Sequence, residues 1–435
     1  MKTLTLPSLF TLFLGAGLLS SPLQVLALNA PTQSPSRQAA EIVNSFALDL
    51  LRADGLVAGN ILFSPYSLQV ALAMSYAGSE GDTRDEMSRV LHYPAAEETL
   101  HGALLALQAE LSRIEAETTR QAEQSRRYGG PSEPVQWNMA NRLFGQQGYA
   151  FRESFLSRMA DTYKAPLQEV DFKADAEGAR LRVNQWVAGE TKDKIRDLIP
   201  IGILDCYTRM VLVNAVYLRA PWQESFNERS TRPLPFHLAG GRDLQVPTMM
   251  HQSDLGYSKS DGYEVVSVPY SGGELHFLII LPESDQTLSA VESGLTVDAL
   301  SAAAWAPKQK VQLYLPKLHL EPPSMALGKV LRSLGMTTAF DEPRGSANFD
   351  RLAPRRLPVD YLYIAEVFHK AFLNLDEKGT EAAAATAVIK AVPTSINPAP
   401  PPEPTIVRVD RPFLFAVQHR SSGACLFMGR VADPR

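Results

Sequence analysis

The chain has 435 residues, 45% of them hydrophobic, so it is long enough to bury a large core. A formal net charge of −5 at pH 7 argues against a nucleic-acid-binding surface. Only two cysteines are present, Cys206 and Cys425, which indicates a fold held by its core rather than by disulfides. Cys425 lies in the apolar run 424–428, so we expect it to be a buried free thiol.

The N-terminal residues 1–27 predict a signal peptide. Lys2 supplies the positive start, an apolar stretch follows, and Val25-Leu26-Ala27 fits a small-x-small cleavage site. A membrane anchor is the alternative, but the apolar stretch is short and is interrupted by Pro7. We therefore expect a secreted protein, extracellular or periplasmic, with no membrane association. No Asn-x-Ser/Thr sequon occurs, so a secreted form would carry no N-glycan.

Residues 38–433 show no linker-like composition and are expected to form one domain, preceded by a flexible segment over 28–37. Apolar residues at helical spacing predict a helix over 38–54 and a buried helix from Ser67. A long charged helix is predicted over 97–127. Its arginines are interleaved with acidic residues, so a solvated surface is favoured over a polyanion-binding face.

Strand patterns dominate the second half of the chain. The apolar run 211–218 is typical of a strand that is covered on both faces. Residues 262–270 and 275–282 flank Ser271-Gly272-Gly273 and predict a hairpin. Early helices and late antiparallel strands together predict an α+β fold. A further strand is expected at 311–315 and a helix at 325–334.

Motifs for catalysis are missing from the sequence. The eight histidines are scattered, with no pair at metal-ligand spacing, and there is no P-loop or dinucleotide-binding turn. Gly78-Ser79-Glu80-Gly81 has the wrong frame for a nucleophile elbow. A Ser-His-Asp site built from distant residues stays an alternative, because chain order is not diagnostic of such sites. We expect no enzymatic activity, no metal and no cofactor.

The segment 377–387 is the most informative part of the chain. Gly379 opens a run of small residues that leads through Val388-Ile389 into a proline-rich stretch. Glycine, β-branched residues and prolines around the run disfavour a helix. Small side chains suit a strand that slides late between strands already packed. A flexible Ala/Pro linker is the alternative reading of the same composition.

Several motifs, in order along the chain, resemble the serpin family over residues 38–433. Any one motif would be weak evidence, but the ordered set makes a chance match very rare. The motifs are Asn60–Ser67, Asn184-x-Trp186-Val187 with Thr191-x-x-Lys194-Ile195, Leu212–Tyr217 followed by Trp222 and Phe226, Leu315-Pro316-Lys317, His369-Lys370-Ala371, Glu377–Ala385, Arg411–Phe415 and Phe427–Val431.

This resemblance implies three β-sheets, eight or nine helices and an exposed reactive loop at about 377–404. In the family, a serine protease attacks the loop, forms an acyl-enzyme and is trapped when the cleaved loop inserts into the main sheet. A non-inhibitory carrier or chaperone-like member is the alternative. Such members tend to have bulky, charged or proline residues in the hinge, so inhibition is favoured here. The matching hinge residues are Glu377, Gly379, Thr380, Glu381, Ala382, Ala383, Ala384 and Ala385.

Two further groups of residues match family motifs. One is a hydrogen-bonded cluster beneath the point where the main sheet parts, for which ordinary buried polar satisfaction is the alternative explanation. The other is a salt bridge between Lys317 and Glu377 beside Trp222, which would contribute little energy as an exposed pair. The cluster comprises Ser64, Ser67, Asn214 and His369.

The reactive bond is predicted at Thr394–Ser395, because residues 391–396 resemble the family's Ala-x-Pro-x-Ser centre. The family's usual spacing from Glu377 instead places the reactive bond at Pro393–Thr394. Cleavage after Lys390 by a trypsin-like protease is a further alternative. An uncharged residue before the bond suggests an elastase-like or subtilisin-like target. The expected partner is a serine protease in a covalent acyl complex, or a cysteine protease, and the inhibitor is expected to be a monomer.

Overall fold

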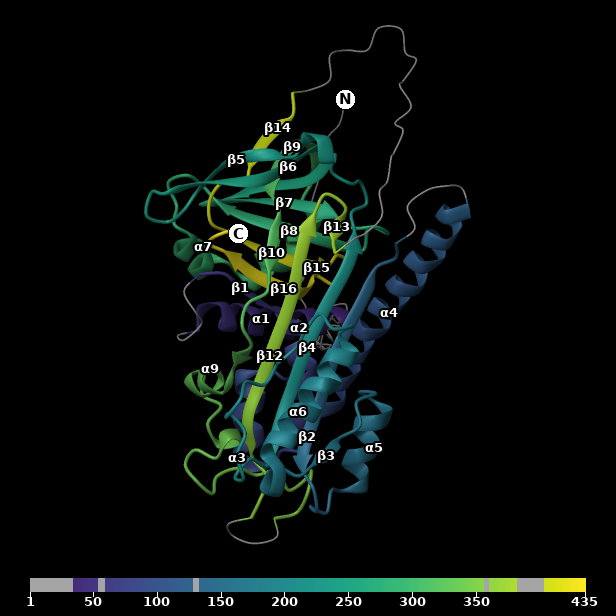
Figure 1. Cartoon of the computed structure of the whole chain (residues 1–435), viewed down its shortest axis with the longest axis vertical. Helices are drawn as coiled ribbons and strands as arrows, with labels where there is room; N and C mark the ends of the chain where they lie inside the picture. The colour runs from purple at the N-terminus through teal and green to yellow at the C-terminus, as the bar shows by residue number, and fades with distance from the viewer. Residues whose placement is uncertain (1–33, 54–58, 128–132, 356–359, 382–402) are drawn as a thin grey trace, which may run out of the picture. The chain divides into compact units, whose positions relative to one another are not determined.

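The computed structural model describes residues 34–53, 59–127, 133–355, 360–381 and 403–435 (Figure 1). The predicted signal peptide, the tract Ala382–Ala385 and the reactive-bond candidates Lys390, Pro393, Thr394 and Ser395 lie outside these residues. Within the described ranges the helices are α1 (Pro35–Arg52), α2 (Pro65–Ala77), α3 (Gly81–Val90), α4 (Glu97–Arg127), α5 (Glu153–Asp161), α6 (Phe172–Glu190), α7 (Leu288–Gly294), α8 (Val297–Ala302) and α9 (Gly328–Ser333), with short 3₁₀ helices at Glu228–Ser230, Ala303–Trp305 and Thr338–Phe340.

The described strands run from β1 to β16 and are longest in the second half of the chain. They are β1 (Ile61–Phe63), β2 (Gln136–Gln146), β3 (Gln168–Val170), β4 (Met210–Pro221), β5 (Arg232–His237), β6 (Asp243–Ser260), β7 (Tyr263–Pro269), β8 (Leu275–Pro282), β9 (Lys308–Pro316), β10 (Leu318–Leu320), β11 (Met325–Ala326), β12 (Ile364–Asp376), β13 (Gly379–Thr380), β14 (Thr405–Arg408), β15 (Phe413–His419) and β16 (Ala424–Val431).

The helix predictions are confirmed with shifted boundaries. α1 begins at Pro35, inside the segment expected to be flexible, because proline suits the first turn of a helix. α2 starts before Ser67, since the Ser64 side chain caps it by accepting a hydrogen bond from Ser67 N at 3.2 Å. The helix expected at 325–334 is wrong at its start: Met325 and Ala326 pair with β12, and α9 begins at Gly328.

A nine-stranded sheet contains the order β1-β16-β15-β8-β7-β6-β9-β14, and β5 also pairs with β6. The predicted hairpin is confirmed as β7 and β8, in which Tyr263 faces Pro282 and Pro269 faces His276. β6 is 18 residues long and pairs with β5, β9 and β7 along its length. It thereby joins two of the three sheets implied by the family resemblance into one hydrogen-bonded ladder.

A seven-stranded sheet has the order β10-β12-β13-β4-β2-β3, with β11 also pairing with β12. Its two longest central strands, β12 and β4, are parallel and pair directly from Ile364 and Met210 up to Phe372 and Tyr217. We name this directly paired stretch the seam. Above the seam, the two-residue strand β13 lies between β12 and β4.

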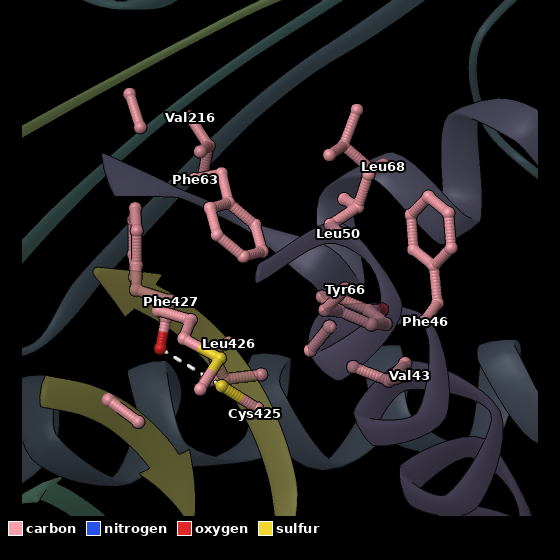
Figure 2. Close-up of a cluster of buried hydrophobic side chains, with 14 of the residues drawn as sticks. Val43, Phe46, Leu50, Phe63, Tyr66, Leu68, Val216, Cys425, Leu426 and Phe427 are labelled. Atoms are coloured by element: carbon pink, nitrogen blue, oxygen red, sulfur yellow. Dashed lines mark hydrogen bonds between the residues drawn. The ribbon is translucent and has the colours of Figure 1, made fainter. Parts of the chain in front are cut away.

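Apolar side chains are buried on both faces of β4, as its sequence predicts. Met210, Leu212 and Val216 belong to the main core, whereas Val211 and Val213 pack in a second cluster with α6. Figure 1 shows α6 lying along β2 and β4. Figure 2 shows the main core, where side chains of α1, β1 and α2 meet Val216 of β4 and Phe427 of β16. The core therefore connects the seam to the nine-stranded sheet.

Both cysteines are free thiols; Cys206 is exposed and Cys425 is buried, as expected for the latter. Burial raises the pKa of the Cys425 thiol, whose sulfur donates to the carbonyl oxygen of Phe427 at 3.0 Å (Figure 2). Within the described ranges, none of the helices combines the length and apolar character needed to cross a bilayer.

Candidate functional site: the hinge and the seam

The first residues of the predicted reactive loop are already part of the seven-stranded sheet. β13 is antiparallel to both neighbours: Thr380 faces Leu375 of β12 and Ala220 of β4. One row above, Gly379 faces Asp376 and Pro221. Below this point β12 and β4 pair with each other, so the slot for a further strand is open for two residues and then closed.

Only glycine fits at position 379. Its φ of +146° is a conformation that other residues rarely adopt. A Cβ atom placed there would also lie 2.2 Å from the carbonyl oxygen of Ala220, which is backbone and cannot move aside. The glycine that opens the hinge motif therefore allows the chain to turn back between the two strands.

Thr380 is completely buried at the inner end of β13. Its hydroxyl lies 2.6 Å from the hydroxyl of Tyr270, and the Tyr270 ring stacks on Trp222 with centroids 4.6 Å apart. Trp222 in turn donates from Nε1 to the carbonyl oxygen of Asp376 at 2.9 Å. The first loop residue that faces the core is thus held by a small polar contact within an aromatic pocket.

Glu381 ends the inserted part of the loop. Its φ of +51° is left-handed, which is uncommon for a residue other than glycine and turns the chain away from the sheet. Its backbone N–H donates to the carbonyl oxygen of Asn374 at 2.8 Å, and its own carbonyl accepts from Arg219 Nε at 2.9 Å. The carboxylate is largely buried and pairs with Lys194 at 2.8 Å.

Glu377 and Lys317 form the salt bridge implied by the resemblance, at 2.9 Å. Glu377 is buried whereas the Lys317 side chain is 40% exposed, so the pair considered from the sequence as exposed is buried on its acidic side only. Thr231 donates to the second carboxylate oxygen at 2.7 Å. Burial acts to raise the pKa of Glu377, but the hydrogen bonds from Lys317 and Thr231 outweigh it, so the pKa is lowered and the carboxylate is charged at neutral pH.

The four residues of the predicted cluster come together across the seam, joined by Asn141. Asn141, Asn214 and His369 lie side by side on β2, β4 and β12. Asn214 Nδ2 donates hydrogen bonds to Ser67 Oγ at 2.6 Å and to Asn141 Oδ1. Asn214 Oδ1 forms a hydrogen bond with His369 Nδ1. We name these five residues, Ser64, Ser67, Asn141, Asn214 and His369, the middle cluster.

The protonation state of His369 follows from its contacts. Its Nε2 accepts a hydrogen bond from Ser64 N at 3.1 Å, so the proton of the neutral ring is on Nδ1 and is donated to Asn214. Burial lowers the pKa of His369 to about 3, because the charged ring has no access to water. Ser64 Oγ also donates to the carbonyl oxygen of Leu426 at 2.6 Å, which ties the cluster to β16.

Several contact residues were missed by sequence reasoning. Asn141 sits in a strand-like run and lies 73 residues from Asn214, so no local pattern reveals its role. Tyr270 and Thr231 contact the hinge from distant parts of the chain. The sequence around Asn141 gave no usable signal, because β2 also contains Asn138 and Arg142 and so does not mark one polar residue as buried.

Comparisons with known proteins agree with this architecture. Residues 41–434 match the family described as "Serpin (serine protease inhibitor)". The chain therefore belongs to the serpin family, and it is an inhibitor rather than an enzyme. The expected α+β serpin fold is confirmed.

Individual relatives can be named. The chain is 35% identical over 403 residues to "Leukocyte elastase inhibitor" from Sus scrofa, covering 89% of this chain and 97% of that protein. It is 34% identical to an uncharacterized serpin-like protein from Thermococcus kodakarensis, covering 90% and 85%. Among solved structures, Serpin48 from Tenebrio molitor, titled "a highly specific serpin", has a TM-score of 0.75 at 27% identity, covering 93% of this chain and all of that one.

Proposed function

We propose that the protein irreversibly inhibits serine endopeptidases by inserting its cleaved reactive loop between β12 and β4. The observation that carries the proposal is β13. Two loop residues already occupy the slot, hydrogen-bonded to both flanking strands, and the seam below them is closed by direct pairing of β12 with β4. The slot thus has a defined position, direction and register for a longer strand.

The proposed reaction begins as ordinary proteolysis. The protease serine Oγ attacks the carbonyl carbon of Thr394, the Thr394–Ser395 amide bond breaks, and the proton goes to the new amino group of Ser395. An ester between the protease and Thr394 remains. Insertion of Thr380–Val392 then carries the ester away from the position where water would hydrolyse it.

The loop sequence suits this insertion. If the β13 register continues, even-numbered positions face the same side as the buried Thr380. These positions are small or apolar up to Val388, namely Ala382, Ala384, Thr386 and Val388. About 12–15 new rows, at about 0.5–1.5 kcal/mol for each net hydrogen bond, amount to a gain on the order of 10 kcal/mol. The uncleaved fold would therefore be held kinetically above its lowest-energy state.

The proposed target is an elastase-like or subtilisin-like protease. The uncharged Thr394 fits a small or shallow specificity pocket, and relatives at 33–35% identity are named leukocyte elastase inhibitors. Pro393–Thr394 and Lys390 stay alternative cleavage positions, and a cysteine protease stays an alternative target. We further propose that the inhibitor is monomeric and is secreted after removal of residues 1–27.

A melting experiment tests insertion directly. Limited cleavage of the loop by a non-target protease should raise the melting temperature by more than about 10 °C, because the freed strand adds a ladder to the sheet. A cleaved sample that melts with the intact one would contradict the proposal and favour a non-inhibitory serpin. Incubation with elastase or subtilisin should in addition give a complex that survives SDS, rather than cleaved inhibitor alone.

A further inference from the structure

Glu97, the first residue of α4, has more positively charged neighbours than its single charge can neutralise. Its side chain is 13% exposed, and the carboxylate accepts hydrogen bonds from Arg84 at 2.7 Å and from Arg351 at 3.0 Å. Arg158 donates to the other carboxylate oxygen. The three guanidinium groups come from α3, from the loop that precedes β12 and from α5. Three positive charges from separate elements therefore surround one negative charge.

The protonation states of the neighbouring groups leave this positive excess in place. Burial acts to raise the pKa of Glu97, but the hydrogen bonds from His101 and Arg351 outweigh it, so the pKa is lowered and the carboxylate is charged at neutral pH. Burial lowers the pKa of His101, so its ring adds no charge at neutral pH. Glu98 lies 3.6 Å from Arg158, but its side chain is 86% exposed, so water weakens that pair.

A hollow of about 400 Å³ opens beside these arginines. Arg158 and Arg351 line it, together with Arg152 and Ser154 at the start of α5. A guanidinium group has five N–H donors. Among the described residues, the Arg152 guanidinium donates one hydrogen bond, to a backbone carbonyl oxygen, and the Arg351 guanidinium donates one, to the carboxylate at the start of α4. Most of these donors are therefore free to bind a ligand in the hollow.

Acidic residues around the hollow limit the ligand that it can accept. Glu80 and Asp350 also line it, and Glu98 lies just beyond Arg158. The Asp350 carboxylate already accepts a hydrogen bond from the backbone N–H of Arg355 at 3.2 Å. An extended polyanion would meet these like charges, whereas a compact anion can lie against the guanidinium groups alone. The planar fork of arginine matches phosphate oxygens with two parallel hydrogen bonds, which favours a small phosphate-bearing ligand.

We propose that this hollow binds a compact, soluble phosphate-bearing molecule, with Arg158 and Arg351 as its main anchors. Arg152 and Ser154 supply further donors from the start of α5. Glu97 positions the anchoring arginines and does not itself contact the ligand. The bound anion supplies the negative charge that the arginines lack, and it joins α5 to the loop that precedes β12. None of these residues belongs to the hinge or the middle cluster, so the site stands whether or not the proposed function holds.

Calorimetric titration of the intact protein with inorganic pyrophosphate tests the site, with sodium chloride of equal ionic strength as the reference. Pyrophosphate should bind once per chain and raise the melting temperature, because it binds the folded chain. Arg351→Met should weaken binding at least about tenfold, since it removes hydrogen bonds between charged groups. Arg332→Met is the matched control and should bind like the wild type: Arg332 is similarly exposed and lies 3.5 Å from Glu342, outside the hollow.

Glu97→Gln should change affinity in the opposite direction. It removes the negative charge among the arginines, so pyrophosphate should bind about two- to fivefold tighter, as expected for one charge several ångströms away in a water-like dielectric. Arg351→Met decides the matter even if Glu97→Gln does not fold, because it leaves Glu97 two arginine partners. No binding by the wild type, or equal affinity in Arg351→Met, would overturn the site. Binding of long polyphosphate or of phosphatidic acid vesicles without binding of pyrophosphate would also overturn it.

Discussion

The seam and the β15–β8 pair are both buried central strand pairs, but they are built differently. Four of the six rows of β15 and β8, from Leu414 to Val417, bring apolar residues together: Phe415 faces Ile279, and its ring stacks on Phe277 with centroids 5.4 Å apart. The central row of the seam instead brings together Asn214 and His369. When two strands separate, the free energy lost from apolar packing grows with the apolar area that becomes exposed. A hydrogen bond between side chains is lost in a single step, and its donor and acceptor must then find new partners.

The difference assigns separate duties to the two sheets. At its centre, in the rows from Leu414 to Val417, the nine-stranded sheet is held by apolar packing. The seam adds the hydrogen bonds of the middle cluster and, above it, the ion pair of Lys194 with Glu381 to its backbone pairing and apolar packing. On the proposed function, the first sheet supports the fold and the second admits the loop.

The largest expected effect is on the hinge. Thr380→Arg would place an uncompensated guanidinium in the buried site beside Tyr270, which costs several kcal/mol. We expect loop insertion to become slower than deacylation of the acyl-enzyme. The moles of inhibitor consumed for each mole of protease should therefore rise by at least about tenfold. Titration of elastase or subtilisin activity measures this ratio.

Thr380→Val is the matched control, because it removes the hydroxyl but stays apolar and of similar volume. It should inhibit with nearly wild-type stoichiometry. One-to-one inhibition by Thr380→Arg would refute insertion.

The next effect concerns the sheet that is expected to stay closed. Phe415→Ala should lower the free energy of unfolding by about 3–5 kcal/mol, because it leaves a cavity against Phe277. The shift of the urea midpoint measures it. The stoichiometry of inhibition should not change; a large increase would show that both sheets take part in opening.

A smaller loss of stability is expected from the seam. Asn214→Ala leaves His369 and Asn141 without their shared partner, at a cost of about 1–3 kcal/mol. Unlike Phe415→Ala, this variant should also convert faster to a loop-inserted form on mild heating, seen as altered mobility on native gels. If Asn214→Ala and Phe415→Ala convert to the loop-inserted form at equal rates, the proposal that only the seam opens for the loop is contradicted.

The smallest effect is the dependence on pH. The folded pKa of His369 is about 3, below the unfolded value of about 6.5. Between these values the unfolded chain binds a proton that the folded chain excludes, so stability falls as pH falls below about 6.5. From pH 7 to 5.5 the loss is about 1 kcal/mol for this histidine.

His276 in the nine-stranded sheet, with a pKa lowered to about 4 by burial, adds a similar loss. In His369→Gln, the difference between the urea midpoints at pH 7 and pH 5.5 should be smaller than in the wild type. The decrease should correspond to the loss expected from one histidine. Identical pH dependence in that variant and the wild type would contradict the burial of a neutral His369.

Much of the fold could be predicted from the sequence, because local patterns carry it. The apolar run around Val213 predicts a strand buried on both faces, and the glycines after Tyr270 predict the hairpin. The strand at Met325 was misjudged, since two residues give no period and only pairing with β12 defines it.

The site could be predicted in part. The motif indicated that Gly379 matters, but its reason, the approach of the Ala220 carbonyl, depends on the arrangement of three strands. The pairing of Lys194 with Glu381 spans 187 residues and appears in no local pattern. Contacts between distant charged side chains are fixed by the assembled sheet, so only the structure reveals them.

The shared direction of β12 and β4 has a geometric consequence. A chain that returns from the end of β12 through the short turn at Lys378 has to run opposite to β12. That same direction is also antiparallel to β4, because β4 points the same way as β12. Each further residue that entered would replace one parallel junction with two antiparallel ones, which pair slightly better for each residue. Had β4 been reversed, an entering strand would have been antiparallel to β12 but parallel to β4, and each row would have gained a parallel junction in place of an antiparallel one.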